Sequence, residues 1–361
     1  MSWSIALLIL FATALAVGAL TPPIRRYALR ISAVQHGGTT HGRGKRAHTG
    51  ALPNVGGIAI FGGSILVLVL AMWFVPSFSA ATDFSQLFPV VLGAIVMWAT
   101  GLFDDLFELS ALVRFGVQIL VALYLAWAGI GIHFVTVLQT PGEYVFIPTW
   151  LGTVVTVLWI VGFTNAFNFI DGLDGLSSGI AVIGAVSLLT VSLGFPERGI
   201  AVLLFAIIAG AATGFLRHNA SPASIIMGDS GAYFLGYLLS VVSIVGAVKV
   251  TAAISLFVPV VVLGLPVLNM TQVTLRRLRR GRNPGEASND HLHDMLRKRS
   301  GSRRQPVYVL WGAAMILAFA GLLLARVGLP RALLSMVLIT VLLAAPSALR
   351  SFEARQQRNQ L

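Results

Sequence analysis

Apolar residues run through this 361-residue chain in long stretches, which shorter polar segments interrupt. Most of the stretches are roughly 16 to 24 residues long, close to the length of about 20 that an α-helix needs to cross about 30 Å of hydrocarbon with its backbone groups bonded internally. The pattern predicts about eleven membrane-spanning helices along the chain. Their predicted bounds are Ile5–Leu20, Gly56–Val75, Phe88–Phe103, Val113–Ile130, Leu151–Phe167, Ser177–Leu193, Ile200–Leu216, Ala232–Val248, Ala252–Leu275, Val307–Ala325 and Ala332–Ala345.

The composition agrees with this pattern, because 57% hydrophobic and 11% charged residues lie outside the range of soluble globular domains. We therefore predict an all-α polytopic integral membrane protein that forms a single domain over residues 1–361. The first apolar run could also belong to a secretory signal, but basic residues follow it rather than precede it, so we predict it as the first helix. Between Gly131 and Trp150, β-branched and aromatic residues alternate around a Pro-Gly pair, which predicts a short outer β-hairpin.

The distribution of Lys and Arg predicts the orientation in the membrane. If the N-terminus lies outside, the outer side keeps only four basic residues, Arg198, Lys249, Arg326 and Arg331. This asymmetry predicts an N-out, C-in topology with an odd number of spans. The predicted inner loops are about 21–55, 104–112, 168–176, 217–231 and 276–306. Contacts with anionic headgroups explain the net charge of +12, so nucleic acid is not an expected partner. Zero cysteines exclude disulfides and thiolate metal sites.

Aspartates gather at the inner ends of the predicted spans, although the chain has only 13 acidic residues. Carboxylates near a membrane helix end are costly unless they are solvated, paired or bound to a cation. Asp104 and Asp105 in "GLFDDLFELS" point about 100° apart on a helix, so one could hold a cation while the other contacts a substrate. The alternative is that they cap the next helix.

The stretch "TNAFNFIDGLDGLSSG" repeats Asn and Asp at a spacing of three, in Asn165, Asn168, Asp171 and Asp174. On a helix or a tight helical turn this spacing brings the four side chains roughly onto one side, and the intervening glycines let a ligand approach the backbone. The pattern favours a site for a polar ligand. A flexible connector with capping residues is the alternative.

Two further polar segments lie on the same predicted side. "RHNASPASIIMGDSGAYFLGY" carries Asn219 and Asp229, and the plain alternative for Asp229 is an N-cap of the following span. His291 and His293 stand among cations, which suits phosphate groups better than a metal ion; the alternative is a basic loop against the membrane surface. Acidic groups suited to Mg²⁺ and basic loops suited to phosphates together indicate phosphoryl transfer at the membrane surface.

Five stretches in order resemble the polyprenyl-phosphate N-acetylhexosamine-1-phosphate transferases of glycosyltransferase family 4. They are "HTGALPNVGGIAIF", "GLFDDLFELS", "NAFNFIDGLDGLSSG", the Asn219–Gly231 segment ending in "MGDSG", and "HLH". The resemblance covers nearly the whole chain. It implies a Mg²⁺-dependent enzyme of the plasma membrane, with its active site on the cytoplasmic face. Mn²⁺ in place of Mg²⁺ and a homodimer stay open.

The implied reaction joins the phosphate of undecaprenyl phosphate, or another polyprenyl phosphate, to the sugar-linked phosphate of a UDP-amino sugar and releases UMP. It would be the first membrane step of cell-envelope polysaccharide synthesis. Asp104 and Asp105 match the catalytic acidic pair, Asp229 matches a Mg²⁺ ligand, and Asn168 matches a metal or substrate ligand. The other matched positions are expected to bind substrate: Asp171, Gly172, Leu173, Asp174, Asn219, Arg114, His291, His293, Lys45, Arg46 and His48.

Departures from the family pattern favour the branch that transfers GlcNAc-1-phosphate. Glu108 stands where the pentapeptide transferases carry a lysine, and "HLHD" replaces their triple histidine. Leu112 replaces a lysine of the family's "LSAK" segment, which leaves Arg114 as the local positive charge. The alternatives are a phospho-MurNAc-pentapeptide transferase, a polytopic transporter or lipid flippase, and an inactive scaffold. Transporters tend to place ionisable groups near the bilayer midplane, whereas these aspartates lie at helix ends.

Overall fold

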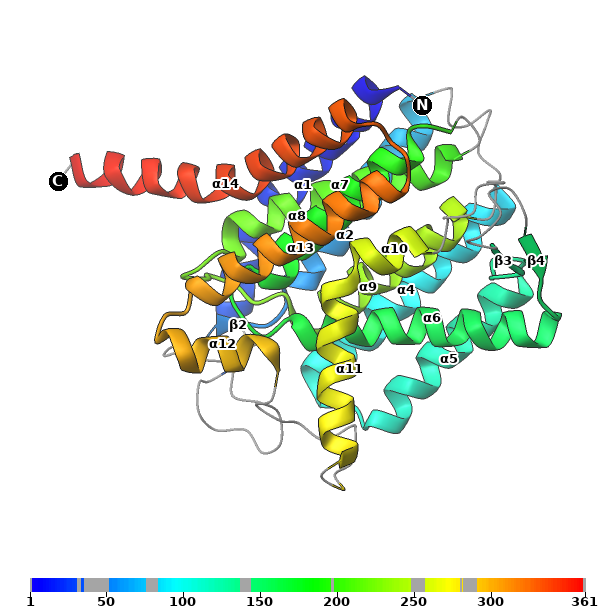
Figure 1. The fold of residues 1–361 in the computed structure, drawn as a ribbon. Helices are drawn as coiled ribbons and strands as arrows, with labels where there is room; N and C mark the ends of the chain where they lie inside the picture. Colours follow the sequence, from blue (N-terminus) through cyan, green and yellow to red (C-terminus); the bar gives the residue numbers. More distant parts are fainter. Residues whose placement is uncertain are drawn as a thin grey trace.

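The computed structural model describes residues 2–30, 34–35, 52–75, 84–136, 144–195, 198–247, 257–279, 281 and 291–359. Helices make up nearly all of this part of the chain (Figure 1). They are α1 (Trp3–Arg30), α2 (Gly56–Phe74), α4 (Phe84–Phe107), α5 (Ala111–Trp127), α6 (Thr149–Ile170), α7 (Leu176–Ser192), α8 (Gly199–Asn219), α9 (Gly228–Ala247), α10 (Phe257–Val262), α11 (Gly264–Arg279), α12 (Leu292–Ser300), α13 (Gln305–Leu324) and α14 (Leu329–Asn359).

Eight of the described helices are long and apolar enough to cross a membrane, and α5 and α7 are shorter apolar helices. The prediction of an all-α polytopic membrane protein is therefore confirmed. The predicted run Ala252–Leu275 is not one continuous helix, because the structure divides it into α10 and α11 at Leu263. Pro266 explains the break, since its ring would clash with the carbonyl of Val262 in an uninterrupted helix.

The centre of the molecule is formed by α7, α8 and α9, whose side chains are buried almost all round. Around them, α1 packs against α8, α4 and α6 pack against α9, and α13 packs against α7. In Figure 1, α1, α7, α8 and α13 run alongside one another, whereas α6 runs in a different direction at their lower right. A helix that is apolar on every side is typical of the interior of a membrane protein.

Small residues let α1 and α8 approach closely. A Cβ atom on Gly210 would lie 2.2 Å from the Leu10 carbonyl oxygen, and one on Gly214 would lie 2.3 Å from the Ala14 carbonyl oxygen. These two glycines stand four residues apart, which is the spacing that brings helix backbones together in membranes. The α1–α8 contact therefore depends on the absence of side chains at these positions.

We expect Gly214→Val to lower the thermal unfolding temperature of the detergent-solubilised protein, because its side chain would collide with α1. Overpacking of this kind costs roughly 1–3 kcal/mol. Gly162→Val on α6 is the matched control, since a Cβ there meets nothing within 4 Å. Equal shifts in the two variants would show that α1 does not pack on Gly214 in this way.

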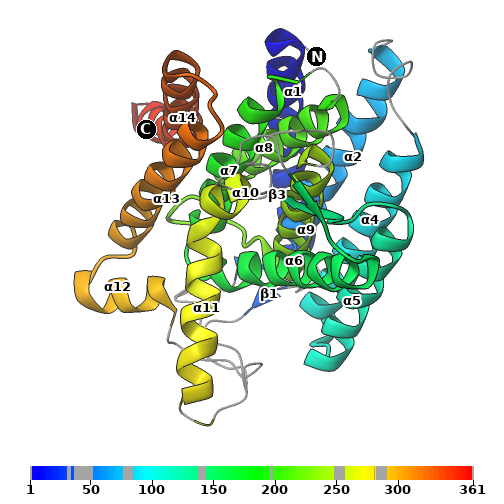
Figure 2. The same ribbon diagram turned by 45° about the vertical axis from the view of Figure 1, so that its right-hand side comes forward.

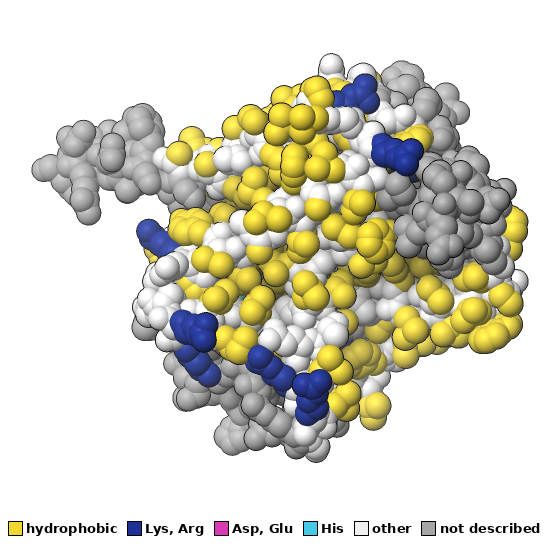
Figure 3. All heavy atoms as spheres, in the orientation of Figure 1, with side chains coloured by type: hydrophobic (Ala, Val, Ile, Leu, Met, Phe, Trp, Pro, Cys, Tyr) yellow, Lys and Arg dark blue, Asp and Glu magenta, His cyan; other side chains and the backbone are white. Residues whose placement is uncertain are grey.

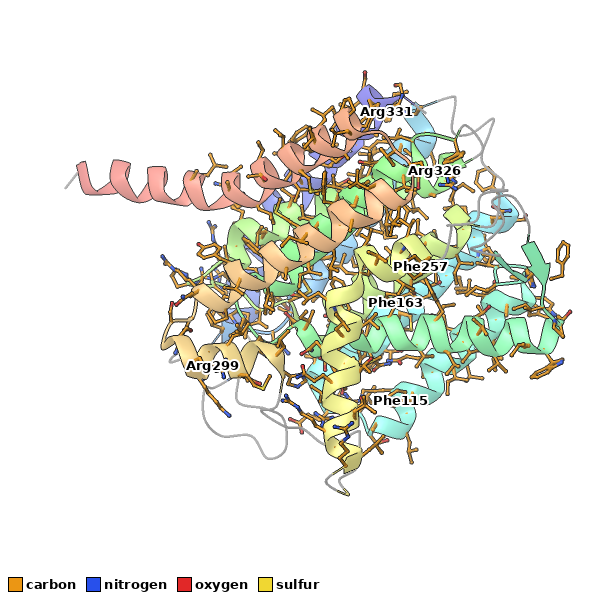
Figure 4. The ribbon with its side chains drawn as sticks, in the orientation of Figure 1. Phe115, Phe163, Phe257, Arg299, Arg326 and Arg331 are labelled. Carbon is orange, nitrogen blue, oxygen red and sulfur yellow. The ribbon has the colours of Figure 1, made fainter. Side chains whose placement is uncertain are left out.

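The surface combines a broad apolar band with basic edges. Figure 3 shows hydrophobic side chains across the middle of this face, with Lys and Arg mainly along the lower edge and a few at the upper edge. In the same orientation, Figure 4 places Arg326 and Arg331 at the upper edge and Arg299 at the lower left. Large exposed residues such as Trp73, Phe115 and Leu158 lie on the helices of this fold. Such a band is what lipid contact requires.

Two short antiparallel strand pairs accompany the helices. Strands β3 (Phe134–Thr136) and β4 (Tyr144–Phe146) pair with Phe134 opposite Phe146, which confirms the predicted hairpin. Strands β1 (Val34–Gln35) and β2 (Leu52–Pro53) form a second pair that the sequence pattern did not indicate. Figure 2 shows β1 and α12 in the lower half of the molecule, where α11 also runs. The polar residues of the candidate site lie at the ends of α4 and α6 and at the starts of α5, α9 and α12.

Candidate active site

Asp105, at the end of α4, binds the first turn of α9. Its Oδ1 accepts hydrogen bonds from the Asp229 backbone N–H at 2.8 Å and from Asn54 Nδ2 at 2.7 Å. Its Oδ2 accepts from the Ser230 backbone N–H at 3.0 Å and from Ser230 Oγ at 2.8 Å. The free N–H groups of a helix N-terminus attract negative charge, so this carboxylate caps α9 from another helix.

Asp104 faces a different neighbour. Its Oδ2 lies 3.1 Å from Arg114 Nη1, and its Oδ1 accepts from the Leu109 backbone N–H at 2.8 Å. The two adjacent aspartates therefore contact different groups of the protein, whereas the prediction that one holds a cation and the other a substrate stays a prediction. The alternative that they cap the next helix is wrong, because the Ser110 side chain is the N-cap of α5. Asp104 instead holds Arg114, which enters from the first turn of α5.

Asp229 brings α6 and α9 together. Asn168, near the end of α6, donates a hydrogen bond from Nδ2 to Asp229 Oδ1 at 2.7 Å. Asp229 lies in the first turn of α9 but does not cap it, since Asp105 fills that role. Asp229, which the resemblance implies as a Mg²⁺ ligand, and Asn168, which it implies as a metal or substrate ligand, are therefore direct neighbours.

The Asn and Asp residues of the repeated spacing bond to different partners. Asn165 contacts Gln118 of α5, whereas Asn168 contacts Asp229 of α9. Helix α6 ends at Ile170, so Asp171 and Asp174 lie in the turn that follows rather than on the helix. The repeated spacing therefore spans the end of a helix and the turn after it, and the prediction that its members bind one polar ligand stays a prediction.

The turn after α6 is held by its own polar groups. Asp171 accepts from Ser177 Oγ at 2.7 Å, and Asp174 accepts from the Ala223 backbone N–H at 3.1 Å. Asn219 accepts from the Gly175 N–H and donates to the Ile225 carbonyl oxygen. The turn 171–175 is thereby fixed to the 219–225 segment, which leads into α9. Leu173 is buried within this arrangement.

Helix α12 closes onto the same turn. A Cβ atom on Gly172 would lie 2.0 Å from His293 Nε2, so only glycine allows this contact. The rings of His291 and His293 stack with centroids 5.2 Å apart, and His291 meets Phe169 edge-on. Asn269 of α11 accepts from the Leu292 N–H at 2.9 Å. Residues more than a hundred positions apart are thus brought together at the end of α6.

Burial and the nearby Arg297 lower the pKa of His293 from 6.5 to about 4. His293 is therefore neutral at pH 7, and His293 Nδ1 has no hydrogen-bond partner within the described part of the chain. A neutral His293 adds no positive charge to this loop, and the prediction that the loop suits phosphate groups stays a prediction. Positive charge near this loop comes instead from arginines such as Arg277, whose guanidinium lies 5.5 Å from the Phe169 ring centre.

The neutrality of His293 predicts a pH dependence. Its folded pKa lies below the ordinary value, so its stabilising contribution is complete above about pH 6.5 and is lost as pH falls towards 4. We expect the free energy of opening of α12, measured by hydrogen exchange, to be roughly 2 kcal/mol lower at pH 5 than at pH 7.5. His293→Gln should remove most of this difference, and Asp294→Asn controls for the neighbouring carboxyl. An unchanged pH dependence in His293→Gln would contradict the assignment.

Sequence reasoning missed several residues of this region. Asn54, Gln118, Ser177 and Ser230 contact residues that it had named, and Asn269 contacts Leu292, which lies between the two named histidines. Asn54 lies in the stretch "HTGALPNVGGIAIF" that carried part of the resemblance, so a signal was present. Lys45, Arg46 and His48 lie outside the described residues.

The fit of a divalent cation can be judged from the donor atoms. Within the described residues, no group of three or more His, Cys, Asp or Glu side chains could hold a metal ion. The Asp229 carboxylate nevertheless offers hard oxygen ligands, and the Asn168 side-chain amide, which also carries an oxygen, lies beside it. Mg²⁺ in phosphate chemistry is typically bound through one or two carboxylates plus substrate oxygens and waters, so this donor set fits it.

Comparison with known proteins adds family relationships. Residues 87–247 match the family model described as Glycosyl transferase family 4. The chain is 32% identical over 305 residues to the probable undecaprenyl-phosphate N-acetylglucosaminyl 1-phosphate transferase of Bacillus subtilis, covering 84% of this chain and 81% of that protein. It is 32% identical over 319 residues to the decaprenyl-phosphate N-acetylglucosaminephosphotransferase of Mycobacterium tuberculosis, covering 83% and 77%. It is 31% identical over 298 residues to the undecaprenyl-phosphate alpha-N-acetylglucosaminyl 1-phosphate transferase of Thermotoga maritima, covering 82% and 83%.

Proposed function

The chain belongs to glycosyl transferase family 4, and we propose that it transfers N-acetylglucosamine-1-phosphate from UDP-N-acetylglucosamine to undecaprenyl phosphate or a related polyprenyl phosphate. The products are a polyprenyl-diphospho-sugar and UMP, and the reaction starts the membrane stage of a cell-envelope polysaccharide. The observation that carries this proposal is the meeting of Asp104, Arg114, Asn168 and Asp229 at the joined ends of α4, α5, α6 and α9.

The proposed chemistry is a direct displacement. A phosphate oxygen of the lipid forms a bond to the β-phosphorus of the UDP-sugar, while the bond from that phosphorus to the oxygen of UMP breaks. Arg114 would neutralise the charge that gathers on the phosphoryl oxygens, and Asp104 would orient it through the 3.1 Å ion pair. Catalysis of phosphoryl transfer rests mainly on such positioning and charge neutralisation.

A divalent cation would complete this site. Asp229 and Asn168 are the residues that would hold Mg²⁺, or Mn²⁺ in its place. The cation would neutralise the diphosphate of the bound nucleotide sugar. The turn from Asp171 to Asp174, together with Asn219, would bind the nucleotide, and His291 with His293 would cover the sugar phosphate. The same set is expected to include Lys45, Arg46 and His48 of the first inner loop.

The topology belongs to the same proposal. Eleven spans with the N-terminus outside and the C-terminus inside would put this site on the cytoplasmic face of the plasma membrane, where UDP-sugars are available. The basic residues of the predicted inner loops support this orientation. Fusion of a reporter domain to each terminus would test it, and an outside location of the C-terminal reporter would contradict it.

The reaction can be tested with purified protein, UDP-N-acetylglucosamine, undecaprenyl phosphate and Mg²⁺. We expect release of UMP together with a lipid product that is heavier by one N-acetylhexosamine phosphate. UDP-MurNAc-pentapeptide in place of UDP-N-acetylglucosamine should give no UMP. The substrate assignment fails if neither product forms from UDP-N-acetylglucosamine, or if only the pentapeptide substrate reacts.

A further inference from the structure

Three segments of the chain meet at the carboxylate of Asp105. They are the end of α4, Asn54 just before α2, and the first turn of α9. Each oxygen of Asp105 accepts two hydrogen bonds, one pair from Asn54 Nδ2 and the Asp229 N–H and the other from the Ser230 N–H and Oγ. A carboxylate whose two oxygens are both engaged in this way is occupied as an acceptor and is poorly placed to take a proton from a substrate.

The backbone around this point is closely packed. A Cβ atom on Gly101 of α4 would lie 2.5 Å from the Asp229 carbonyl oxygen. Gly228 has a positive φ of 78°, and a Cβ atom there would lie 2.5 Å from Asp105 Oδ2 and 2.8 Å from the Asn54 carbonyl oxygen. Only glycine satisfies both conditions at this position. Asp229 therefore follows a backbone segment that has little room to move.

The segment before α2 pairs with the segment before α9. The Ile226 N–H donates to the Pro53 carbonyl oxygen at 2.9 Å, and the Gly56 N–H donates to the Ile226 carbonyl oxygen at 3.0 Å. The Gly57 N–H donates to the Met227 carbonyl oxygen at 2.9 Å. These backbone bonds run alongside the bond from Asn54 to Asp105, so the segment just before α2 and the start of α9 form one unit.

We propose that Asn54 and Asp105 are positioning residues whose task is to set where the Asp229 side chain points. Asp105 holds the backbone of Asp229 and Ser230 directly, and Asn54 holds Asp105. Asp229 then reaches Asn168 at 2.7 Å. Of the acidic pair, Asp105 thus holds the start of α9, whereas Asp104 pairs with Arg114. The inference rests on the proposed function only in so far as Asp229 is taken to bind the substrate's cation.

Partners that orient a metal ligand typically change metal affinity by about 10–100-fold when they are removed. We expect Asn54→Ala to raise the half-saturating Mg²⁺ concentration for UMP release by about 10-fold and to lower kcat, with the KM for the UDP-sugar nearly unchanged. The amides of Asp229 and Ser230 should exchange hydrogen faster in the detergent-solubilised variant, even without metal or substrate. Ser187→Ala is the control, because Ser187 is buried and its hydroxyl donates only to Ile183 of its own helix.

Asp105→Asn tests whether Asp105 positions the start of α9 or acts as a base on the substrate. Its amide nitrogen would face N–H donors of α9, so both the Mg²⁺ requirement and the exchange of the α9 amides should change more than in Asn54→Ala. If Asp105 were instead the base, this variant would lose activity with the Mg²⁺ requirement and amide protection intact, and the proposal would be overturned. Unchanged exchange and Mg²⁺ requirement in Asn54→Ala would overturn it as well. The two proposals can also fail separately. If the wild type releases no UMP but the α9 amides exchange faster in Asn54→Ala, the positioning role is supported and the proposed reaction is rejected.

Discussion

Replacing Asp229 by asparagine should lower the rate of UMP release by about 10²–10³-fold, the usual loss when one group that stabilises transition-state charge is removed. The substitution keeps the size of the side chain but removes its negative charge, so the pair with Asn168 would bind a cation more weakly. The Mg²⁺ requirement should rise at the same time. Initial rates measured across a series of Mg²⁺ concentrations would separate this effect from a general loss of folded protein.

Glu108→Gln is the matched control for Asp229→Asn. It also removes one carboxylate charge, just beyond the end of α4, but Glu108 is exposed. Its rate and Mg²⁺ requirement should stay within about twofold of the wild type, as expected for a surface charge. Full activity with an unchanged Mg²⁺ requirement in Asp229→Asn would remove Asp229 from the metal assignment.

The helices were predictable because span length and apolarity are local properties of the sequence. Each predicted run coincides with helix in the described residues, for example Gly56–Val75 with α2 and Val307–Ala325 with α13. The division of the ninth run had a local signal too. Gly264 and Pro266 stand inside it, and a proline in a helical pattern marks a break or kink. The length of the run alone suggested a single span and did not reveal this break.

The contacts of the site were less predictable, since they join residues that are distant in sequence. Asp105 binds Asn54, which is 51 positions away, and the backbone N–H of Asp229, which is 124 positions away. A capping rule applied along the chain looks for the partner of a helix N-terminus within a few residues. Here the cap of α9 comes from α4, so the rule assigned Asp229 a task that Asp105 performs.

Burial was the second quantity that the sequence concealed. His293 stands among cationic residues in the sequence, and this neighbourhood suggested a charged site. The structure buries its ring against Gly172, and burial disfavours the charged form. The sequence shows which ionisable groups are present, whereas packing decides which of them are charged at neutral pH.

Replacing Arg114 by methionine should reduce both stability and activity. Asp104 is buried and pairs with Arg114 at 3.1 Å, so removing the guanidinium leaves a buried carboxylate without its cation. Breaking a buried pair in this way costs on the order of 3–5 kcal/mol, which thermal unfolding would detect as a large drop. We also expect UMP release to fall by about 10²-fold or more, because the positive charge beside the reacting phosphates is lost.

The double variant Asp104→Asn with Arg114→Met separates the two roles of Arg114. With the buried charge removed as well, unfolding stability should return most of the way to that of the wild type, since the penalty in the single variant comes from the unpaired carboxylate. Activity should stay low, because neither the guanidinium nor the carboxylate is present. A double variant that regained both stability and activity would mean that Arg114 serves only to neutralise Asp104, and that the phosphates are held by other cations.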